Sequence, residues 1–242
     1  MRRFSKTSQR TKWLDLWPEW DIVLELDHRA DDPEPAFSIS YMQVQVDWDD
    51  GNEPVTYNRT SSVQKQTYAG TYPIGRHLVK LKVTNRYNNA GNLHFGNATS
   101  SSLNGVAQMP QIIRVKKLDG SGTVANRPKI QSLSLCFNRC LRLESVDCPI
   151  IVGNATDLGY FFRFCVNLKG KVEIPYFAAT TTFSYAFYNC INLEEVQLGD
   201  APSMTTFNYV FYNCSELKKA KLGAFSNPIP FGYAFWRMQR SY

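Results

Sequence analysis

The chain has 242 residues, of which 43% are apolar and 20% charged, so it can bury an ordinary core and is not a disordered polypeptide. No stretch approaches the ~20 apolar residues that a membrane span requires. The net charge of +6 is unevenly distributed, because residues 13–54 hold twelve acids and one base, whereas residues 55–118 hold nine bases and no acid. This alternation predicts faces that complement each other or a partner, and it argues against nucleic-acid binding.

The first 20 residues form a basic and aromatic arm. Its basic start is not followed by an apolar stretch, so it is not expected to be a secretory signal. Two interpretations stay open: an ordered lead-in whose tryptophans pack on the next domain, or a flexible arm that becomes ordered on a partner assembly. The second interpretation makes Arg2, Arg3, Trp13 and Trp17 candidate partner-binding residues.

Residues 21–118 are predicted to form a β-sandwich. Apolar and polar residues alternate at 22–26, 37–41, 42–48, 77–84 and 112–115, and residues 68–74 are also expected to form a strand. A tight turn is expected at 49–52, where Gly51 suits a positive φ. Many short strands within about 100 residues favour two packed sheets.

The stretch VQVDWDDGN at residues 44–52, followed by YAGTY at 68–72 and VKLKVT at 79–84, resembles a PKD-type immunoglobulin-like domain. This resemblance covers residues 37–86 and implies an immunoglobulin-like sandwich. Within it, Asp47, Asp49 and Asp50 are candidate calcium ligands, since clustered carboxylates suit a hard cation. The alternative is a turn in which these side chains cap backbone amides.

The sequence between the two halves is rich in small polar residues. Residues 87–110 are either a recognition loop or a variable crossing of the sandwich. Glycine and serine at 119–129 predict a linker, which places the domain boundary there.

Residues 130–242 form a repeat array. Cys140, Cys165, Cys190 and Cys214 are spaced 25, 25 and 24 residues apart. Each has a phenylalanine three residues before it and a leucine three residues after it: Phe137, Phe162, Phe187, Phe211, Leu143, Leu168, Leu193 and Leu217. A unit of ~25 residues cannot bury its apolar side alone, so the units are predicted to stack. Each turn of the stack should have one short strand and, opposite it, a short helix or helical turn.

The two most regular units are FSYAFYNCINLEEVQL at 183–198 and FNYVFYNCSELKKAKL at 207–222, and they resemble BspA-like leucine-rich repeats. The resemblance implies a leucine-rich-repeat solenoid that acts in surface adhesion and recognition rather than catalysis. The regular cysteines could bind metal or form disulfides. They could instead be small buried residues of the repeat core, which the absence of a CxxC or Cys/His cluster favours.

The sequence therefore predicts a mainly β protein, with an immunoglobulin-like sandwich followed by a short leucine-rich solenoid. No catalytic, phosphate-binding or metalloprotease motif is present, so neither enzyme activity nor a cofactor is expected. The leading hypothesis is a bacteriophage virion protein, a head-decoration or tail-associated subunit. Repeats of this kind usually lie on exposed surfaces, but the N-terminus has no expected export signal. A virion component reaches the exterior by cell lysis rather than by secretion. Its partners would be other virion proteins, copies of itself, or a host surface protein or glycan.

On the solenoid, the candidate contacts are Tyr188, Asn189, Tyr212 and Asn213, which lie beside the core positions. Glu194 and Glu195 are further candidates. The alternative function is a bacterial or protist cell-surface adhesin that binds host protein or glycan. A glycoside-acting enzyme with accessory modules is a third class, which the absence of a catalytic domain disfavours.

Overall fold

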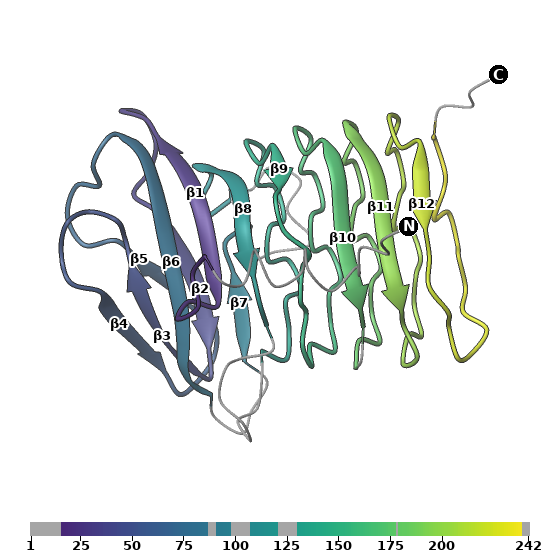
Figure 1. The fold of residues 1–242 in the computed structure, drawn as a ribbon, viewed down its shortest axis with the longest axis horizontal. Coiled ribbons are helices and arrows are strands. Elements are labelled where there is room, and N and C mark those ends of the chain that lie inside the picture. The colour runs from purple at the N-terminus through teal and green to yellow at the C-terminus, as the bar shows by residue number, and fades with distance from the viewer. Residues whose placement is uncertain (1–15, 87–90, 98–106, 121–129, 178, 239–242) are drawn as a thin grey trace, which may run out of the picture.

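The computed structural model describes residues 16–86, 91–97, 107–120, 130–177 and 179–238. Within these residues the protein is mainly β, and no helix is present. Figure 1 shows two packed sheets at one end of an elongated molecule and a row of stacked coils at the other. No helical segment of the described residues has the length and hydropathy of a membrane span.

The N-terminal part, the two-sheet region (residues 21–120), consists of a large and a small sheet. The large sheet has the order β4-β3-β6-β1-β8-β9, in which the edge strand β9 (Ser145–Val146) comes from the C-terminal part, and the small sheet has the order β5-β2-β7. All pairs within the region are antiparallel. Its strands are β1 (Ile22–His28), β2 (Ala36–Ser40), β3 (Met42–Asp47), β4 (Val55–Arg59), β5 (Gln64–Thr67), β6 (Gly75–Arg86), β7 (Asn92–His94) and β8 (Ile112–Leu118).

Aromatic side chains fill the space between the two sheets. Phe37 of β2 lies with its ring centroid 5.3 Å from that of Tyr57 and 6.0 Å from that of Trp48. Phe37 and Trp48 are at most 2% exposed. Residues from both sheets therefore share one dry interior, in agreement with the strand alternation in the sequence.

The strand predicted at residues 68–74 is wrong. The small sheet instead uses β5, and both β4 and β5 lie in a segment for which no strand was predicted. Residues 68–74 leave the sheet because Tyr68 and Tyr72 turn their hydroxyl groups inward, donating to Asp50 Oδ2 (2.8 Å) and to the Trp48 carbonyl (2.5 Å). Gly70, with a φ of 107°, allows the chain to bend between the two tyrosines.

The charged segments of the N-terminal half pair with one another, as their distribution predicts. Asp47 of β3 contacts Lys80 of β6 at 2.8 Å. Glu25 of β1 lies within 3.4 Å of cationic nitrogens of Arg76, Arg114 and Lys116. Glu25, Asp47 and the four bases around them are thus neutralised within the large sheet.

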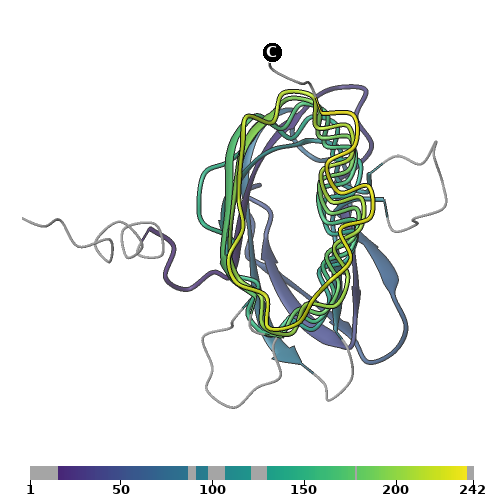
Figure 2. The ribbon, with the colours of Figure 1, turned by 90° about the vertical axis from the view of Figure 1, so that its right-hand side faces the viewer.

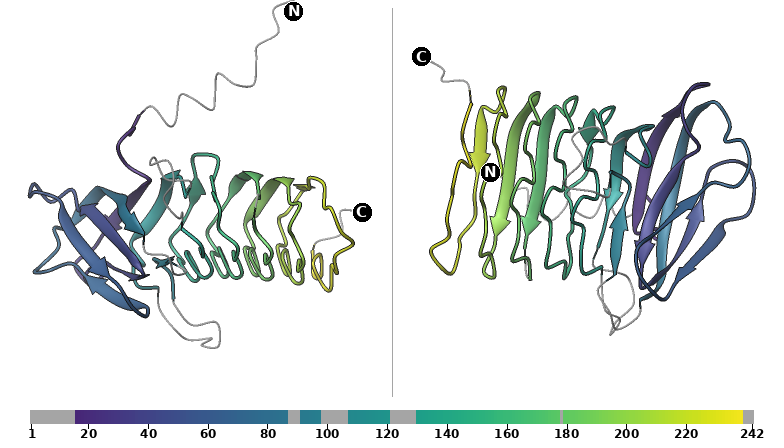
Figure 3. Two further views of the ribbon diagram at one scale, coloured as in Figure 1. Left: turned by 90° about the horizontal axis from the view of Figure 1, so that it is seen from below. Right: turned by 180° about the vertical axis from the view of Figure 1, so that it is seen from behind.

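The C-terminal part, the coil stack (residues 130–238), consists of five successive coils at residues 130–153, 154–177, 179–202, 203–226 and 227–238. One side carries the short strands β9 (Ser145–Val146), β10 (Gly170–Tyr176), β11 (Leu193–Asp200) and β12 (Lys219–Lys221), of which β10, β11 and β12 form a parallel sheet. Figure 2, which looks along the stack, shows the strands on one side of a closed outline and tightly turning backbone on the other. Figure 3 shows the same arrangement of strands and turns from below (left panel) and from behind (right panel).

Equivalent side chains stack on their own copies in the interior. The rings of Phe137, Phe162, Phe187 and Phe211 follow one another at 5.1, 5.5 and 5.7 Å. The repeated leucines and cysteines are buried beside them, with Leu217 the most exposed at 8%: Leu143, Leu168, Leu193, Leu217, Cys140, Cys165, Cys190 and Cys214. A stack of identical contacts explains why these positions recur in the sequence.

The two parts share one continuous hydrophobic core. Strand β8 pairs in parallel with β9 of the first coil, with Val115 opposite Val146. On the opposite side, the Phe95 ring stacks on Phe137 at 5.6 Å, so it extends the phenylalanine row into the two-sheet region. A side chain at Gly96 would collide with the Asn138 backbone, which shows how closely the two parts approach. Residues 121–129 of the predicted linker lie outside the described residues, so the boundary at 119–129 stays a prediction.

Candidate recognition surface

The side of the coil stack opposite the strands is a wall of hydrogen-bonded turns. This turn wall comprises residues 133–140 of the first coil and the equivalent residues 158–165, 183–190, 207–214 and 231–238. Alternate amides donate within the coil, as from Cys136 to the Leu133 carbonyl (3.1 Å). The remaining amides donate to the next coil, as from Leu135 to Gly159 (2.9 Å). Of the short helix or helical turn predicted for this side, the described residues contain no helix, because half of the amides bond to a neighbouring coil; turns closed by hydrogen bonds between residues three apart are present instead.

Two residues in each turn segment adopt the left-handed conformation. In the third coil these are Tyr185 and Asn189, both with a φ of 60°, and in the fourth coil Tyr209 and Asn213, both at 57°. Such a φ costs roughly 1–2 kcal/mol for most residues and less for asparagine. The hydrogen bonds between coils offset this cost, as where Asn189 donates its amide to the Tyr212 carbonyl at 2.9 Å. The turns therefore direct the side chains at these positions outward.

The outer surface of the turn wall carries two rows of stacked tyrosines. Tyr160, Tyr185, Tyr209 and Tyr233 form one row, with ring centroids 5.0, 4.8 and 5.1 Å apart. In the second row Tyr188 and Tyr212 stack at 4.7 Å, with 6° between the ring planes. The rings of the third and fourth coils are half-buried, whereas Tyr233 and Trp236 of the fifth coil are 55% and 53% exposed.

The structure brings together four of the residues predicted to bind a partner. Beside the stacked rings of Tyr188 and Tyr212, the amide nitrogen of Asn213 donates to the amide oxygen of Asn189 at 2.7 Å. Arg2, Arg3 and Trp13 lie outside the described residues. Trp17 lies on the two-sheet region, where its carbonyl accepts a hydrogen bond from Lys117 (2.9 Å), so it does not join the turn wall.

Two arginines lie at the end of the turn wall nearest the two-sheet region. The guanidinium carbons of Arg139 and Arg163 are 5.0 and 4.7 Å from the centroid of the Phe164 ring, within cation–π range. Burial, aided by the nearby Arg139, lowers the pKa of Arg163. This end of the wall is therefore both aromatic and cationic.

The strand side of the stack has a different character. Its charges pair within the sheet, as between Lys171 and Glu173 (3.1 Å) and between Lys219 and Glu195 (2.9 Å). A groove of about 530 Å³ lies between the strands and the turn wall, lined by Glu144, Asn167, Lys169, Asn192, Glu194 and Glu216. Its asparagines are structural, since each donates to a carbonyl of the preceding coil at 2.7 Å.

A second cavity, of about 430 Å³, lies on the large sheet. It is lined by Trp17, Glu25, Asp49, Arg76, His77, Leu78 and Lys116. Glu25 is ion-paired to the surrounding bases, and the two His77 ring nitrogens contact the carbonyls of Asp49 and Pro73 at 3.1 and 2.9 Å. The charges and the ring nitrogens of this cavity are therefore already occupied within the chain.

The candidate calcium ligands are used by the turn. Asp47 accepts from the Asp49 amide (2.9 Å), Asp49 from the Leu78 amide (2.8 Å), and Asp50 from the Asn52 amide (3.0 Å). No group of three or more His, Cys, Asp or Glu side chains in the described residues is arranged to hold a metal ion. The carboxylates act here as turn caps, so calcium binding stays the less favoured of the two interpretations.

The thiols are free and buried. Cys165, Cys190 and Cys214 each donate to a phenylalanine carbonyl of the preceding coil, at 3.0–3.1 Å. Burial raises the pKa of every one of them, to about 12 for Cys214. They are therefore protonated members of the core rather than reactive groups.

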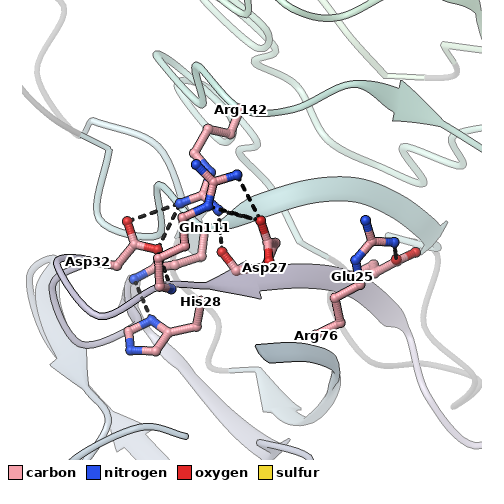
Figure 4. A network of polar contacts seen from close by, with 8 residues as sticks. Glu25, Asp27, His28, Asp32, Arg76, Gln111 and Arg142 are labelled. Carbon is pink, nitrogen blue, oxygen red and sulfur yellow. Dashed lines mark hydrogen bonds and ion pairs between the residues drawn. The ribbon is translucent and has the colours of Figure 1, made fainter. Parts of the chain in front are cut away.

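A polar network at the junction was not predicted from the sequence (Figure 4). Arg142 of the first coil reaches the two-sheet region, where its nitrogens lie 2.7 Å from Asp32 and 2.9 Å from Asp27, and it also donates to the Asp27 carbonyl. The Arg29 guanidinium beside Asp27 lowers the pKa of that carboxyl, and Arg142 lowers it further. Nearby, the Gln111 side chain contacts His28 at 3.3 Å. This junction network fixes the first coil against the end of β1.

Comparison with known protein families supports the repeats identified in the sequence. Residues 131–235 match the family model of the BspA type leucine rich repeat region, in six copies. Repeats of this type indicate a surface or recognition protein, and they are typically recognition modules without enzyme activity. Searches of curated proteins and of solved structures found no match. The family match begins at residue 131, so the PKD-type resemblance of the two-sheet region stays a prediction.

Proposed function

We propose that this protein is a non-enzymatic recognition protein that presents the turn wall of a leucine-rich solenoid to a partner. The observation that carries this proposal is the contrast between the inside and the outside of the repeats. The buried rows consist of phenylalanine, leucine and cysteine, whereas the outer surface of the turn wall collects tyrosine, tryptophan and arginine, the residues most enriched at binding hot spots. A surface built in this way suits binding better than catalysis.

We further propose that the protein is a subunit of a bacteriophage virion, either a head decoration or a tail-associated protein. In this proposal the arm (residues 1–20) and an immunoglobulin-like sandwich formed by the two-sheet region dock on the particle, and the repeats project. The PKD-like sequence followed by BspA-like repeats supports it, as does the shared core, which would hold the repeats at a fixed angle. A rigid connection lets a projecting module meet its target in a defined orientation.

The test is mass spectrometry and immunogold labelling of purified particles. We expect the full chain in particles at a defined ratio to the major capsid protein, with antibodies against residues 183–222 labelling their exterior. Absence from the particles would exclude the virion proposal and leave the recognition proposal standing.

A cell-surface adhesin is the second candidate, and the BspA-type match favours it. Protease treatment of intact producing cells separates the two. Loss of the full chain from the cell surface under mild trypsin, with no protein in particles, would establish the adhesin.

A further inference from the structure

The aromatic residues of the turn wall exceed what the fold requires. At the position five residues before the cysteine, the first coil has Leu135 where later coils have tyrosine. At the position two residues before it, the second coil has Arg163 where the third and fourth coils have Tyr188 and Tyr212. The turn has the same hydrogen bonds and left-handed residues in all these coils. The turn itself therefore does not require aromatic rings at these positions.

The arrangement of the rings indicates which kind of partner the wall suits. Tyr185 and Tyr209 lie 4.8 Å apart with 6° between their planes, so each ring covers a face of the other. Sugars bind aromatic residues through a free ring face, and this stacking removes most of those faces. The ring rims, the tyrosine hydroxyls and the neighbouring asparagine amides remain, already held in one orientation. Protein-binding loops of antibodies use this combination, which loses little side-chain entropy on binding.

The charge of the wall is of one sign. The positions at six, five, two and one residues before the cysteine or its equivalent hold Arg139, Arg163 and Arg237 and no acidic residue in any of the five coils. Arg163 is 8% exposed, so Arg139 and Arg237 are the more accessible cations. Arg139 and Arg163 lie against the aromatic rows through the shared Phe164 ring. A partner that covers this surface gains from acidic side chains opposite the arginines.

The strand side offers a less suitable surface. Lys171 is already held by Glu173 and by the side-chain oxygen of Gln197, at 3.1 and 3.0 Å. A partner would have to break these contacts before it made its own. The strand side is therefore less suited to binding a partner than the turn wall.

We propose that the turn wall binds an acidic segment of a protein partner. In this complex the rims of Tyr188 and Tyr212 form the centre of the interface, and Arg139 pairs with a carboxylate at one end. The inference rests on the proposed recognition function and adds to it the face used and the chemistry of the partner.

The experiment selects binders from a library of random twelve-residue peptides on the immobilised full chain. We expect enrichment of peptides that combine acidic and apolar residues, with affinities that fall as salt is raised. The double variant Tyr188→Ser/Tyr212→Ser should weaken the selected peptides by about tenfold or more, the loss typical of hot-spot side chains. A matched control on the strand side, Lys171→Ser/Gln197→Ser, should leave the affinity within about twofold.

A second variant keeps the test valid if loss of the stacked rings unfolds the protein. Arg139→Glu reverses one charge on the wall and leaves the tyrosines in place. It should weaken acidic peptides by about tenfold while the melting temperature stays close to that of the parent chain. Circular dichroism and thermal melting of each variant establish that it is folded before its affinity is compared.

Three outcomes would overturn the inference. The first is no enrichment of peptides, and the second is enrichment of peptides that lose affinity with the strand-side control and keep it with the wall variants. The third is binding of the chain to insoluble cellulose, chitin or xylan that disappears in the tyrosine variant, which would identify a glycan partner instead. Because none of these assays involves particles, failure here is distinct from absence of the protein from virions.

Discussion

Replacement of Arg142 by methionine tests whether the junction network joins the two parts of the molecule. The Arg142 side chain is 21% exposed and the two carboxylates that it contacts, those of Asp27 and Asp32, are 25% and 16% exposed. Exposed ion pairs contribute about 0–1 kcal/mol, and breaking a buried one costs about 3–5 kcal/mol. We therefore expect Arg142→Met to lower the free energy of unfolding by about 2 kcal/mol, an intermediate value.

Urea denaturation followed by tryptophan fluorescence measures this change. For a chain of this size, 2 kcal/mol corresponds to a melting temperature lower by roughly 4–8 °C. Arg29→Met is the matched control, because Arg29 contacts the same Asp27 carboxylate but its side chain is 67% exposed. The control should cost less than about 0.5 kcal/mol. A double-mutant cycle with Asp32→Asn should give a coupling energy of about 1–2 kcal/mol.

Equal effects of Arg142→Met and Arg29→Met would refute this reasoning, as would a coupling energy near zero.

A second consequence of the junction network concerns the pH dependence of stability. The folded-state pKa of Asp27 is lowered, so the stabilisation from its ion pairs is present above the unfolded pKa, near 3.8. It disappears as the pH falls through the lower folded value. The stability difference between Arg142→Met and the parent chain should therefore shrink in strong acid.

Three further predictions concern the interior and the turn at residues 47–52. Burial lowers the pKa of His94 to about 4, below the unfolded value near 6.5. The free energy of unfolding should therefore fall by roughly 2 kcal/mol from pH 7 to pH 5. In urea titrations, His94→Leu should make the free energy of unfolding less dependent on pH over this range. The six buried thiols should resist Ellman's reagent in the native protein and react fully in guanidinium; fast native labelling would contradict their burial. Millimolar calcium should leave the melting temperature unchanged, because the Asp50 carboxylate is already hydrogen-bonded to Asn52 and Tyr68, and a clear rise would restore the calcium hypothesis.

The interior of the repeats could be predicted from the sequence because each buried residue packs against its own copy. Such a site accepts the same side chain in every coil, as at Cys165 and Cys190, and the repetition is visible without coordinates. The turn segment could not be predicted in the same way. Its left-handed residues include Tyr185 and Phe164, types that rarely adopt this conformation, so the local sequence resembles a helix.

The contact between the two-sheet region and the first coil could not be predicted from the sequence for a different reason. Met109, Ile112 and Val115 have the spacing of Cys140, Leu143 and Val146, and Val115 lies opposite Val146 of the first coil. The cysteine is absent from this segment and its phenylalanine lies much further away in sequence, so a search for the repeated pattern does not find it. The spacing of the three apolar residues is the signal that could have revealed it.

This hidden segment also accounts for how the stack begins. A coil contacts only its neighbours, so the first coil would expose its apolar side unless another element covered it. Residues 92–95 and 109–118 provide that cover, because Phe95 continues the aromatic row and β8 continues the strand side. The two-sheet region thus presents the first coil with a surface shaped like another coil. Because both sides of the first coil are fixed in this way, the direction of the turn wall relative to the two sheets is set by the core itself. Any partner held by the two-sheet region therefore determines where the tyrosine rows point.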